Sequence, residues 1–209
     1  MSRLLLILAA IPLQAQDFNL PETLQRVERR YNNARTIQVP FEQTYSAPGR
    51  PRRSESGTLY LRKPGRMRWD YSNPAGKVFL SDSKYIYFYS PSTNRVEKSP
   101  AKATDDLRAP LAFLLGKLDF RRDFREFRVR REGENTYIAA IPKSDKAPYQ
   151  QVDFVVAPDY QIRRLIVVSH DGSQMDFKFG GERINPALAG SLFVFKVPEG
   201  AELIETGGK

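Results

Sequence analysis

Hydrophobic residues recur along this chain at two spacings, and each spacing predicts a different kind of element. Between residues 20 and 35, the apolar side chains of Leu24, Val27 and Tyr31 lie three or four residues apart. This spacing places them on one face of a helix, which we therefore expect to cover an apolar surface. From Ile37 onward the spacing falls to two, which is typical of β-strands with one buried face.

The alternating pattern predicts about ten strands, joined in sequence as antiparallel hairpins. It is clearest at residues 66–71, where Met67, Trp69 and Tyr71 alternate with charged side chains. We expect these three side chains to face inward, because neighbours along a strand point to opposite faces. The expected strands begin at Ile37 and continue at residues 54–63, 66–71, 77–81, 84–90, 126–131, 136–142, 151–156, 162–169, 174–179 and 192–197.

The strand expected at residues 84–90 is unusual, because every position from Tyr85 to Tyr89 is apolar or aromatic. Such a strand is buried on both faces, or one of its faces lines a cavity that water fills poorly. Burial on both faces is the commoner arrangement. The pattern does not decide which face would line a cavity.

A helical insertion is expected at residues 104–117, between the early and the late strands. Thr104 and the two aspartates after it are typical of a helix start, and an apolar stretch follows up to Gly116. Pro110 interrupts this stretch, which predicts two short helices or a kinked one lying over a sheet. No internal repeat and no long linker divides the chain. We therefore expect one mainly β domain of the α+β class.

The N-terminus has the features of a secretory signal peptide. The positive charge of Arg3 precedes an apolar run from Leu4 to Leu13, and the small residue Ala15 precedes polar residues. This run of about ten residues is roughly half of a bilayer span and matches the central region of a signal peptide. We expect residues 1–15 to be removed near Ala15, which leaves residues 16–209. A buried N-terminal strand or helix is the alternative.

Composition excludes many kinds of active site. The chain has no cysteine and one histidine, so it has no disulfide, no thiolate metal site and no site of two or three histidines. His170 lies beside Ser169 and Asp171 in a polar turn, where adjacent side chains point in different directions and do not form a triad. We expect a protein that is not an enzyme and has no catalytic residue, metal or cofactor.

Positive charge is the other compositional feature. The chain has 33 Lys and Arg against 24 Asp and Glu, a formal net charge of +9, and basic residues cluster between positions 50 and 68 near aromatic ones. Nucleic-acid-binding proteins share this combination, but the expected export argues against a nucleic-acid partner. The cluster suits anionic lipid head groups or an acidic docking surface, and a solvated basic face fits equally well.

Four segments share residue types and order with one known family. They are residues 57–71, Ser81–Asp82, Pro110 with Leu114 and Leu115, and residues 193–200. The most specific is residues 57–71, in which two basic residues and a proline precede a strand that carries Trp69 and Tyr71. Together these segments resemble the periplasmic outer-membrane lipoprotein carrier proteins, the LolA family, over nearly all of the expected mature chain.

This resemblance implies an incomplete antiparallel β-barrel whose apolar concave face is covered by a helical lid. It implies a monomeric periplasmic chaperone that binds the acyl chains of lipoproteins, receives them from an inner-membrane ABC transporter and delivers them to an outer-membrane receptor, where one exists. A periplasmic carrier or sensor of another lipid, such as a glycolipid or an acyl signal, is the alternative. The residues implied are Met67, Trp69, Tyr71, Tyr87, Tyr89, Phe177 and Phe179 in the cavity, Leu24, Val27, Tyr31, Leu111, Leu114 and Leu115 in the lid, and Lys63 in lid closure.

Three positions depart from the family's pattern. Lys63 stands where the family often has arginine, Met67 where it usually has phenylalanine, and Ser83 where it usually has glycine. Because a lysine lacks the guanidinium fork, we expect few polar ties between the lid and the sheet and a low cost of opening. Met67 keeps the cavity apolar, whereas Ser83 loses the easy positive φ of glycine.

Overall fold

A computed structural model describes residues 19–101 and 118–206. The expected signal peptide and the whole of the expected helical insertion at 104–117 therefore lie outside the described residues. In those two ranges, no helix is both long enough and apolar enough to cross a membrane.

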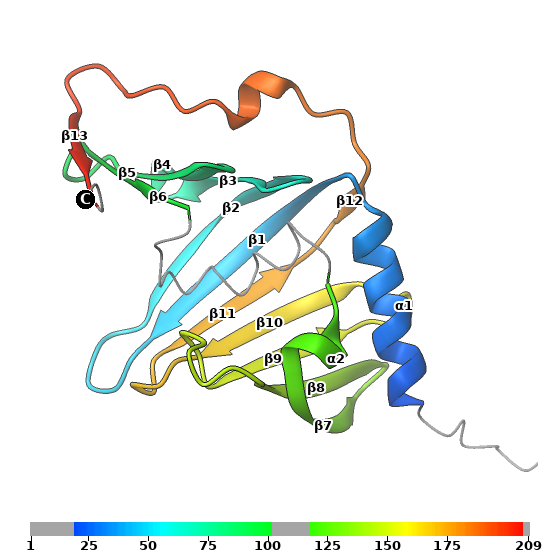
Figure 1. The fold of residues 1–209 in the computed structure, drawn as a ribbon. Helices are drawn as coiled ribbons and strands as arrows, with labels where there is room; N and C mark the ends of the chain where they lie inside the picture. Colours follow the sequence, from blue (N-terminus) through cyan, green and yellow to red (C-terminus); the bar gives the residue numbers. More distant parts are fainter. Residues whose placement is uncertain (1–18, 102–117, 207–209) are drawn as a thin grey trace, which may run out of the picture.

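One large antiparallel sheet makes up most of the molecule (Figure 1). The elements are α1 (Leu20–Asn33), β1 (Thr36–Ser46), β2 (Arg53–Arg62), β3 (Arg66–Asn73), β4 (Ala75–Asp82), β5 (Tyr85–Ser90), β6 (Arg95–Pro100), α2 (Phe120–Asp123), β7 (Phe124–Glu132), β8 (Asn135–Pro142), β9 (Gln151–Val156), β10 (Ile162–Val168), β11 (Gln174–Phe179), β12 (Arg183–Ile184), the 3-10 helix η2 (Gly190–Phe193) and β13 (Glu202–Glu205). The strands lie in the order β13-β6-β5-β4-β3-β2-β1-β11-β10-β9-β8-β7, with β12 beside β1.

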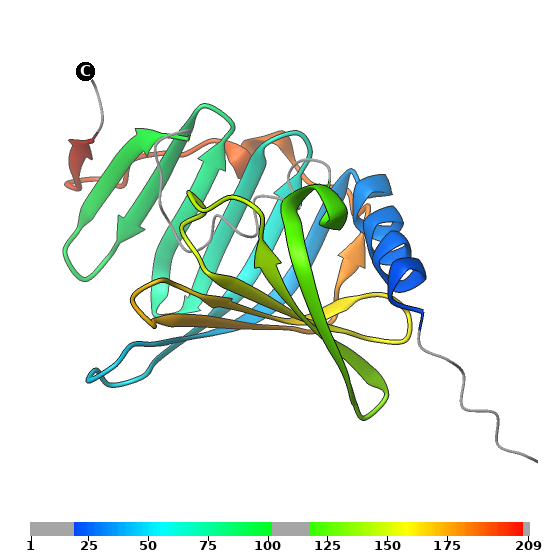
Figure 2. The same ribbon diagram turned by 60° about the horizontal axis from the view of Figure 1, so that its bottom comes forward.

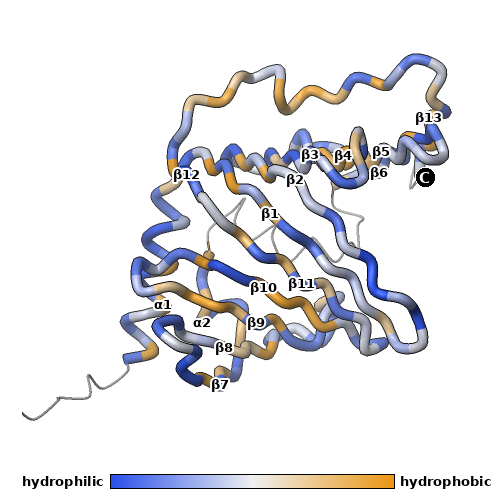
Figure 3. The backbone as a smooth tube through the Cα atoms, turned by 180° about the vertical axis from the view of Figure 1, so that it is seen from behind, coloured by the Kyte–Doolittle hydropathy of each residue, from blue (hydrophilic) through white to orange (hydrophobic). Residues whose placement is uncertain are grey.

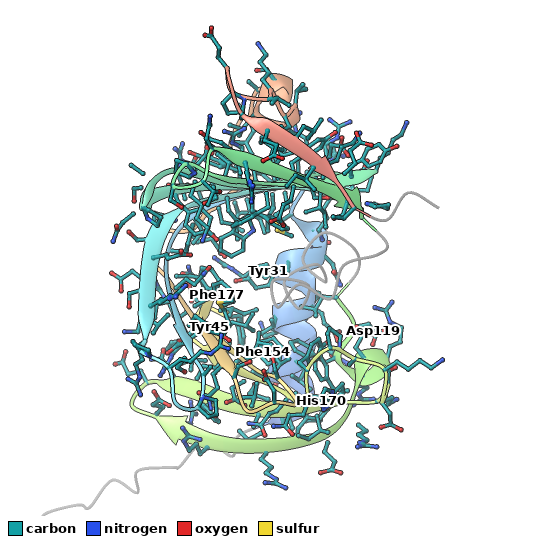
Figure 4. All side chains as sticks on the ribbon, turned by 90° about the vertical axis from the view of Figure 1, so that its left-hand side faces the viewer. Tyr31, Tyr45, Asp119, Phe154, His170 and Phe177 are labelled. Carbon is teal, nitrogen blue, oxygen red and sulfur yellow. The ribbon has the colours of Figure 1, made fainter. Side chains whose placement is uncertain are left out.

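The sheet curls into an open half-barrel. Its first half, β1–β6, is steeply inclined to its second half, β7–β11 (Figure 2). Viewed along the barrel, the strands form a C, and α1 lies across the open side (Figure 4). The strands β7 and β13 are the two ends of the order, so the described sheet does not close. The incomplete antiparallel barrel expected from the sequence is confirmed, and the one exception to its strand direction is the parallel pairing of β13 with β6.

Helix α1 forms where the apolar spacing predicted it. The side chain of Asn19 accepts a hydrogen bond from the backbone nitrogen of Glu22, which satisfies one of the free N–H groups of the first turn. Its buried side chains are those expected, Leu24, Val27 and Tyr31. The helix therefore packs its single apolar face against the barrel.

The hydrophobic core lies on the concave face of the sheet. Val39, Leu59, Trp69 and Phe79 stand opposite one another on four neighbouring strands, and paired residues of an antiparallel sheet share a face. All four are buried. Hydrophilic and hydrophobic positions alternate along the strands, as the colouring of the backbone shows (Figure 3). This alternation gives the sheet one apolar face and one mixed face.

The strand predicted at residues 192–197 is wrong. Residues Gly190–Phe193 form the short helix η2, and residues 194–201 have no strand. The alternation there is real, because Phe193 is buried while Val194 is exposed, but it arises from packing on the outside of the sheet and not from strand pairing. The sequence analysis also missed β6, which has one buried apolar residue, and β12 and β13, which are only two and four residues long.

Residues 186–201, which we call the C-terminal strap, run across the convex face of β2–β6 toward β13 (Figure 1). A guanidinium nitrogen of Arg62 donates to the carbonyl oxygen of Leu188, and one of Arg68 donates to that of Leu192 at 3.2 Å. Arg62 also lies over the ring of Phe193, 5.4 Å from its centroid. The strap thereby covers the outer face of the first half of the sheet.

Candidate functional site: the concave apolar face

An apolar cluster on the concave face contains most of the residues expected in the cavity. Met67, Trp69, Tyr71 and Phe177 are all buried, with at most 4% of any of them exposed. The ring of Trp69 lies 5.3 Å from that of Phe177, and its indole nitrogen donates to the sulfur of Met67 at 2.8 Å. These side chains join β3 to β11, which are far apart in the sequence.

Phe179 lies at the border of this cluster. It is partly buried, and its ring is parallel to that of Phe177 with 6.2 Å between the centroids. Its neighbour on β1 is Phe41, which packs edge-on against both Trp69 and Tyr71. The departure at Met67 from the family's phenylalanine therefore leaves the concave face apolar.

The expected placement of Tyr87 and Tyr89 in the cavity is corrected by the register of β5. Phe88 stands opposite Phe79 and Ile86 opposite Ser81, so Ile86 and Phe88 share the concave face. Tyr87 points to the convex face, where its ring stacks on that of Phe195 in the C-terminal strap at 4.8 Å. Tyr89, two residues on, shares this convex face. Strand β5 thus has side-chain contacts on both faces, but five of its six residues are only half-buried and Tyr85 is 40% exposed, so it is not buried on both faces as its sequence suggested.

Both halves of the barrel supply core residues that the sequence analysis did not assign to the site. Phe154 on β9 is fully buried, and Tyr45 at the end of β1 is partly buried against the same core. Both point into the barrel beside Phe177 (Figure 4). The alternation that placed Trp69 inward also holds along most of β1, so this signal was available for Tyr45, whereas β9 is buried at five consecutive positions and gives no such signal for Phe154.

The lid expected from the sequence is only partly described. Leu111, Leu114 and Leu115 lie outside the described residues. The other expected lid residues, Leu24, Val27 and Tyr31, belong to the same buried cluster as Trp69. Helix α1 is therefore part of the cover of the concave face.

Lys63 does contact this helix. Its ammonium nitrogen donates to the carbonyl oxygen of Tyr31 at 2.8 Å, near the C-terminal end of α1, where a positive charge also opposes the helix dipole. Burial lowers the pKa of Lys63 from its ordinary value. The single contact agrees with the expectation that a lysine makes one point contact where an arginine would make several.

The expectation that few polar ties hold the cover is wrong for α1, because Glu182 also binds it. This carboxylate, whose side chain is 4% exposed, accepts from the guanidinium of Arg30 at 2.7 Å and from the hydroxyl of Tyr31 at 2.9 Å. The same hydroxyl oxygen accepts from the backbone nitrogen of Ile162 at 2.9 Å. Burial and the nearby Glu182 carboxylate raise the pKa of Tyr31, so its hydroxyl stays protonated and remains a donor.

Two more residues of α1 are tied to the segment before β7. The side chain of Asn32 donates to the carbonyl oxygen of Leu118 and accepts from its backbone nitrogen, both at 2.8 Å. The carboxylate of Glu28 accepts from the backbone nitrogen of Phe120 at 2.8 Å. Because these buried or half-buried bonds would all have to break, displacing α1 as a whole is costly.

The turn at Ser83, where the family usually has glycine, is stabilised by hydrogen bonds from its neighbours. Ser83 has a φ of 86°, in the left-handed region that favours glycine. The carboxylate of Asp82 accepts from the backbone nitrogens of Lys84 at 2.8 Å and Tyr85 at 2.7 Å. These bonds hold the turn that leads into β5.

His170 takes part in turn structure. One ring nitrogen lies 3.0 Å from the carbonyl oxygen of Ala147, and the neighbouring Asp171 accepts from the hydroxyl and the backbone nitrogen of Ser173. Those bonds from Ser173 lower the pKa of Asp171. Within the part of the chain that the structure describes, no three His, Asp or Glu side chains gather as metal ligands would.

Comparison with known proteins identifies the family. The family model described as the outer membrane lipoprotein carrier protein LolA matches residues 32–196, from the end of α1 to the C-terminal strap. The chain belongs to this family. The family's members are described as lipoprotein carriers, a role that is not enzymatic.

Relatives share about a quarter of their residues with this chain. The outer-membrane lipoprotein carrier protein of Methylobacillus flagellatus is 26% identical over 176 residues, which are 83% of this chain and 84% of the relative. That of Glaesserella parasuis is 27% identical over 207 residues, 98% of this chain and 96% of the relative. A crystal structure of an uncharacterized conserved protein from Thermus thermophilus shares the fold, with a TM-score of 0.54 and 15% identity over 89% of this chain and 98% of that one.

Proposed function

We propose that this protein is a periplasmic carrier that binds the acyl chains of lipoproteins and takes them from the inner membrane to the outer membrane. Its cargo would be released by an inner-membrane ABC transporter and accepted by an outer-membrane receptor or by the membrane itself. The observation that carries the proposal is the concave apolar face around Trp69, which is closed from water in this structure. Membership of the LolA family supports it.

The chemistry of the cargo explains why such a face is needed. Each methylene group that leaves water contributes about 0.8 kcal/mol, so acylated chains do not cross an aqueous compartment unaided. A carrier has to hide its own apolar surface when empty and offer that surface when loaded. Handover then follows from a difference in affinity between carrier and acceptor and requires no chemical energy at the carrier.

The route into the barrel is proposed to lie away from α1. Tyr45, Ile86, Phe88 and Phe179 are only partly buried against the core, in contrast to the fully buried Trp69. Aromatic side chains of this kind contact acyl chains with little specificity. Because α1 is tied by several hydrogen bonds, acyl chains should reach the core past these four side chains.

The cargo can be identified by purifying the protein from the periplasm and analysing the co-purified molecules by mass spectrometry. We expect acylated N-terminal peptides of lipoproteins. Free glycolipid, with no acylated peptide, would favour a carrier of another lipid. Protein that is recovered free of any acyl compound, while a parallel purification of a known carrier retains its cargo, would contradict the proposal.

Two adjacent residues of β1 test whether the concave face binds acyl chains. Tyr45 and Thr44 are similarly half-buried but point to opposite faces of the strand. Tyr45→Glu should lower the affinity for a fluorescent fatty-acyl probe by about tenfold or more, because it places a carboxylate beside the bound methylenes. Thr44→Glu is the matched control and should change it little. Equal effects of the two substitutions would contradict acyl binding on this face.

A further inference from the structure

Among the described residues, Lys77 on β4 and Glu55 on β2 form a charged pair on the concave face. The ammonium nitrogen lies 2.5 and 2.6 Å from the two carboxylate oxygens, and the side chains are only 14% and 20% exposed. Glu55 stands opposite Gln43 on β1, and Lys77 lies two residues before Phe79 on β4, so both share the face of Trp69. A charged pair is therefore built into the same face as the apolar cluster around Trp69.

Aromatic and polar groups hold this pair in place. The Lys77 ammonium lies over the rings of Tyr71 and Phe88, 4.4 and 5.3 Å from their centroids. The side-chain nitrogen of Gln43, a residue only 6% exposed, donates to Glu55 at 3.0 Å. We call Gln43, Glu55 and Lys77, with the rings of Tyr71 and Phe88, the polar rim.

The polar rim lies toward the end of the sheet that is remote from α1. Gln43 is near the end of β1 and Glu55 near the start of β2, whereas α1 joins β1 at its other end (Figure 1). From Ile37 to Gln43 the strand rises about 20 Å, which is comparable to an extended fatty-acyl chain. A chain lying along the concave face would thus end with its polar group at Lys77 and Glu55.

We propose that the polar rim binds the uncharged ester and amide groups at which acyl chains join the head of a lipoprotein. This inference rests on the proposed function, since it assigns a place to one part of the same ligand. Ester and amide carbonyls are costly to bury without a donor, and Lys77 and Gln43 supply donors. The carboxylate of Glu55 can accept from an amide N–H of the ligand.

The opposite charges of Lys77 and Glu55 should disfavour an anionic head group on the ligand. Lys77 and Glu55 carry opposite charges and lie within a hydrogen bond of each other, so their net charge is zero. A phosphate that approached Lys77 would also meet Glu55, and repulsion by the carboxylate would offset the attraction. A neutral group with both donors and acceptors meets no such repulsion.

The convex face offers a matched control. Lys98 on β6 also pairs with a carboxylate, that of Glu205 at 2.9 Å, and also lies 4.4 Å from the centroid of a tyrosine ring, that of Tyr85. It stands opposite Tyr87, whose ring is covered by the C-terminal strap, so it shares the convex face. Lys98→Met therefore repeats the chemistry of Lys77→Met on the other side of the sheet.

The test compares 1-lauroylglycerol, which has a neutral ester, with dodecyl phosphate. Binding is followed by the fluorescence of Trp69, the single tryptophan of the chain, which lies in the concave cluster. We expect the unaltered protein to favour lauroylglycerol, and Lys77→Met to weaken its binding about tenfold, as the loss of a charge-assisted hydrogen bond does. Lys98→Met should leave it unchanged.

Glu55→Gln gives a second, independent result, which can be measured even if Lys77→Met fails to fold. Because it removes the negative charge that repels a phosphate, it should shift the preference toward dodecyl phosphate. If Lys77→Met and Glu55→Gln bind both probes as the unaltered protein does, the polar rim is not a head-group site, although acyl binding would stand. If neither probe binds the unaltered protein, the proposed function itself fails.

Discussion

Two segments cover the sheet on opposite sides, and they are held in different ways. Helix α1 closes the concave side with part-buried hydrogen bonds, including those that join Arg30 and Tyr31 to Glu182, whose side chain is 4% exposed. The C-terminal strap covers the convex side through backbone carbonyls and ring contacts, such as Phe195 on Tyr87. The ion pair beside it, Arg95 with Glu202, is exposed.

This difference indicates which cover is the easier to displace. Buried hydrogen bonds to charged groups are costly to break, because each group left behind lacks water as well as its partner. Groups that are already in contact with water lose little when they separate. Helix α1 should therefore stay in place while the protein loads, and the strap should detach first under stress.

The largest effect is expected where α1 meets Glu182. Glu182→Ala removes the acceptor of Arg30 and of the buried Tyr31 hydroxyl, and it should lower the free energy of unfolding by about 3 kcal/mol. Chemical denaturation measures the loss, and hydrogen exchange should show α1 opening before the rest of the sheet. Glu22→Ala is the control, since it removes an exposed pair with Arg26 on the same helix. If Glu182→Ala and Glu22→Ala lower the free energy of unfolding by similar amounts, the burial of Glu182 does not make its contacts more stabilising than those of the exposed Glu22.

The sequence predicted the apolar anchors of α1 but not its polar ties. Leu24, Val27 and Tyr31 follow from helical spacing, which is a local property of the chain. The partner of Tyr31, Glu182, is 151 residues away along the chain and lies in a turn with no pattern of its own. Contacts of this kind depend on how strands are ordered in the sheet, and alternation alone does not fix that order.

The residues expected in the cavity also show what alternation along a strand can and cannot predict. Trp69 and Phe177 are both buried, and each lies in a strand with one more polar face, where alternation identifies the buried side. Strand β5 is apolar at every position from Tyr85 to Tyr89, so its pattern carries no such information and Tyr87 was assigned to the wrong face. The polar rim was missed because a lysine and a glutamate far apart in sequence show no sign of pairing until the strands are aligned.

A smaller effect is expected where the strap meets β5. Phe195→Ala removes the ring that stacks on Tyr87 and should cost about 1 kcal/mol. Because the strap is separate from the core, we expect faster protease cleavage within residues 186–201 and unchanged hydrogen exchange in α1. Val194→Ala is the control, because Val194 is 57% exposed. Unfolding of the whole sheet by Phe195→Ala would show that the strap is part of the core.

Lys63 should have a smaller effect still, because it is one tie of α1 among several. Lys63→Met removes the bond to the Tyr31 carbonyl and should cost roughly 0.5 kcal/mol at neutral pH. Burial lowers the pKa of Lys63 in the folded protein, so this group adds stability as the pH rises through that pKa toward the unfolded value near 10.5. The loss caused by Lys63→Met should therefore be larger at pH 10 than at pH 7. A loss that shrinks as the pH rises would contradict this account.

The smallest effect is expected at the exposed pair between Arg95 and Glu202, where β13 joins β6. Both side chains are more than half exposed, so Glu202→Gln should leave the unfolding free energy nearly unchanged, and salt should not alter that result. Glu182→Gln carries the same chemical change to a carboxylate whose side chain is only 4% exposed, and it should be clearly destabilising at low and at high salt, since salt screens a partly buried pair much less than an exposed one. Denaturation curves of the two variants, each with and without molar salt, compare the covers directly. If Glu202→Gln proves the more damaging of the two, the strap is held by its charges, and α1 must be reconsidered as the cover that moves.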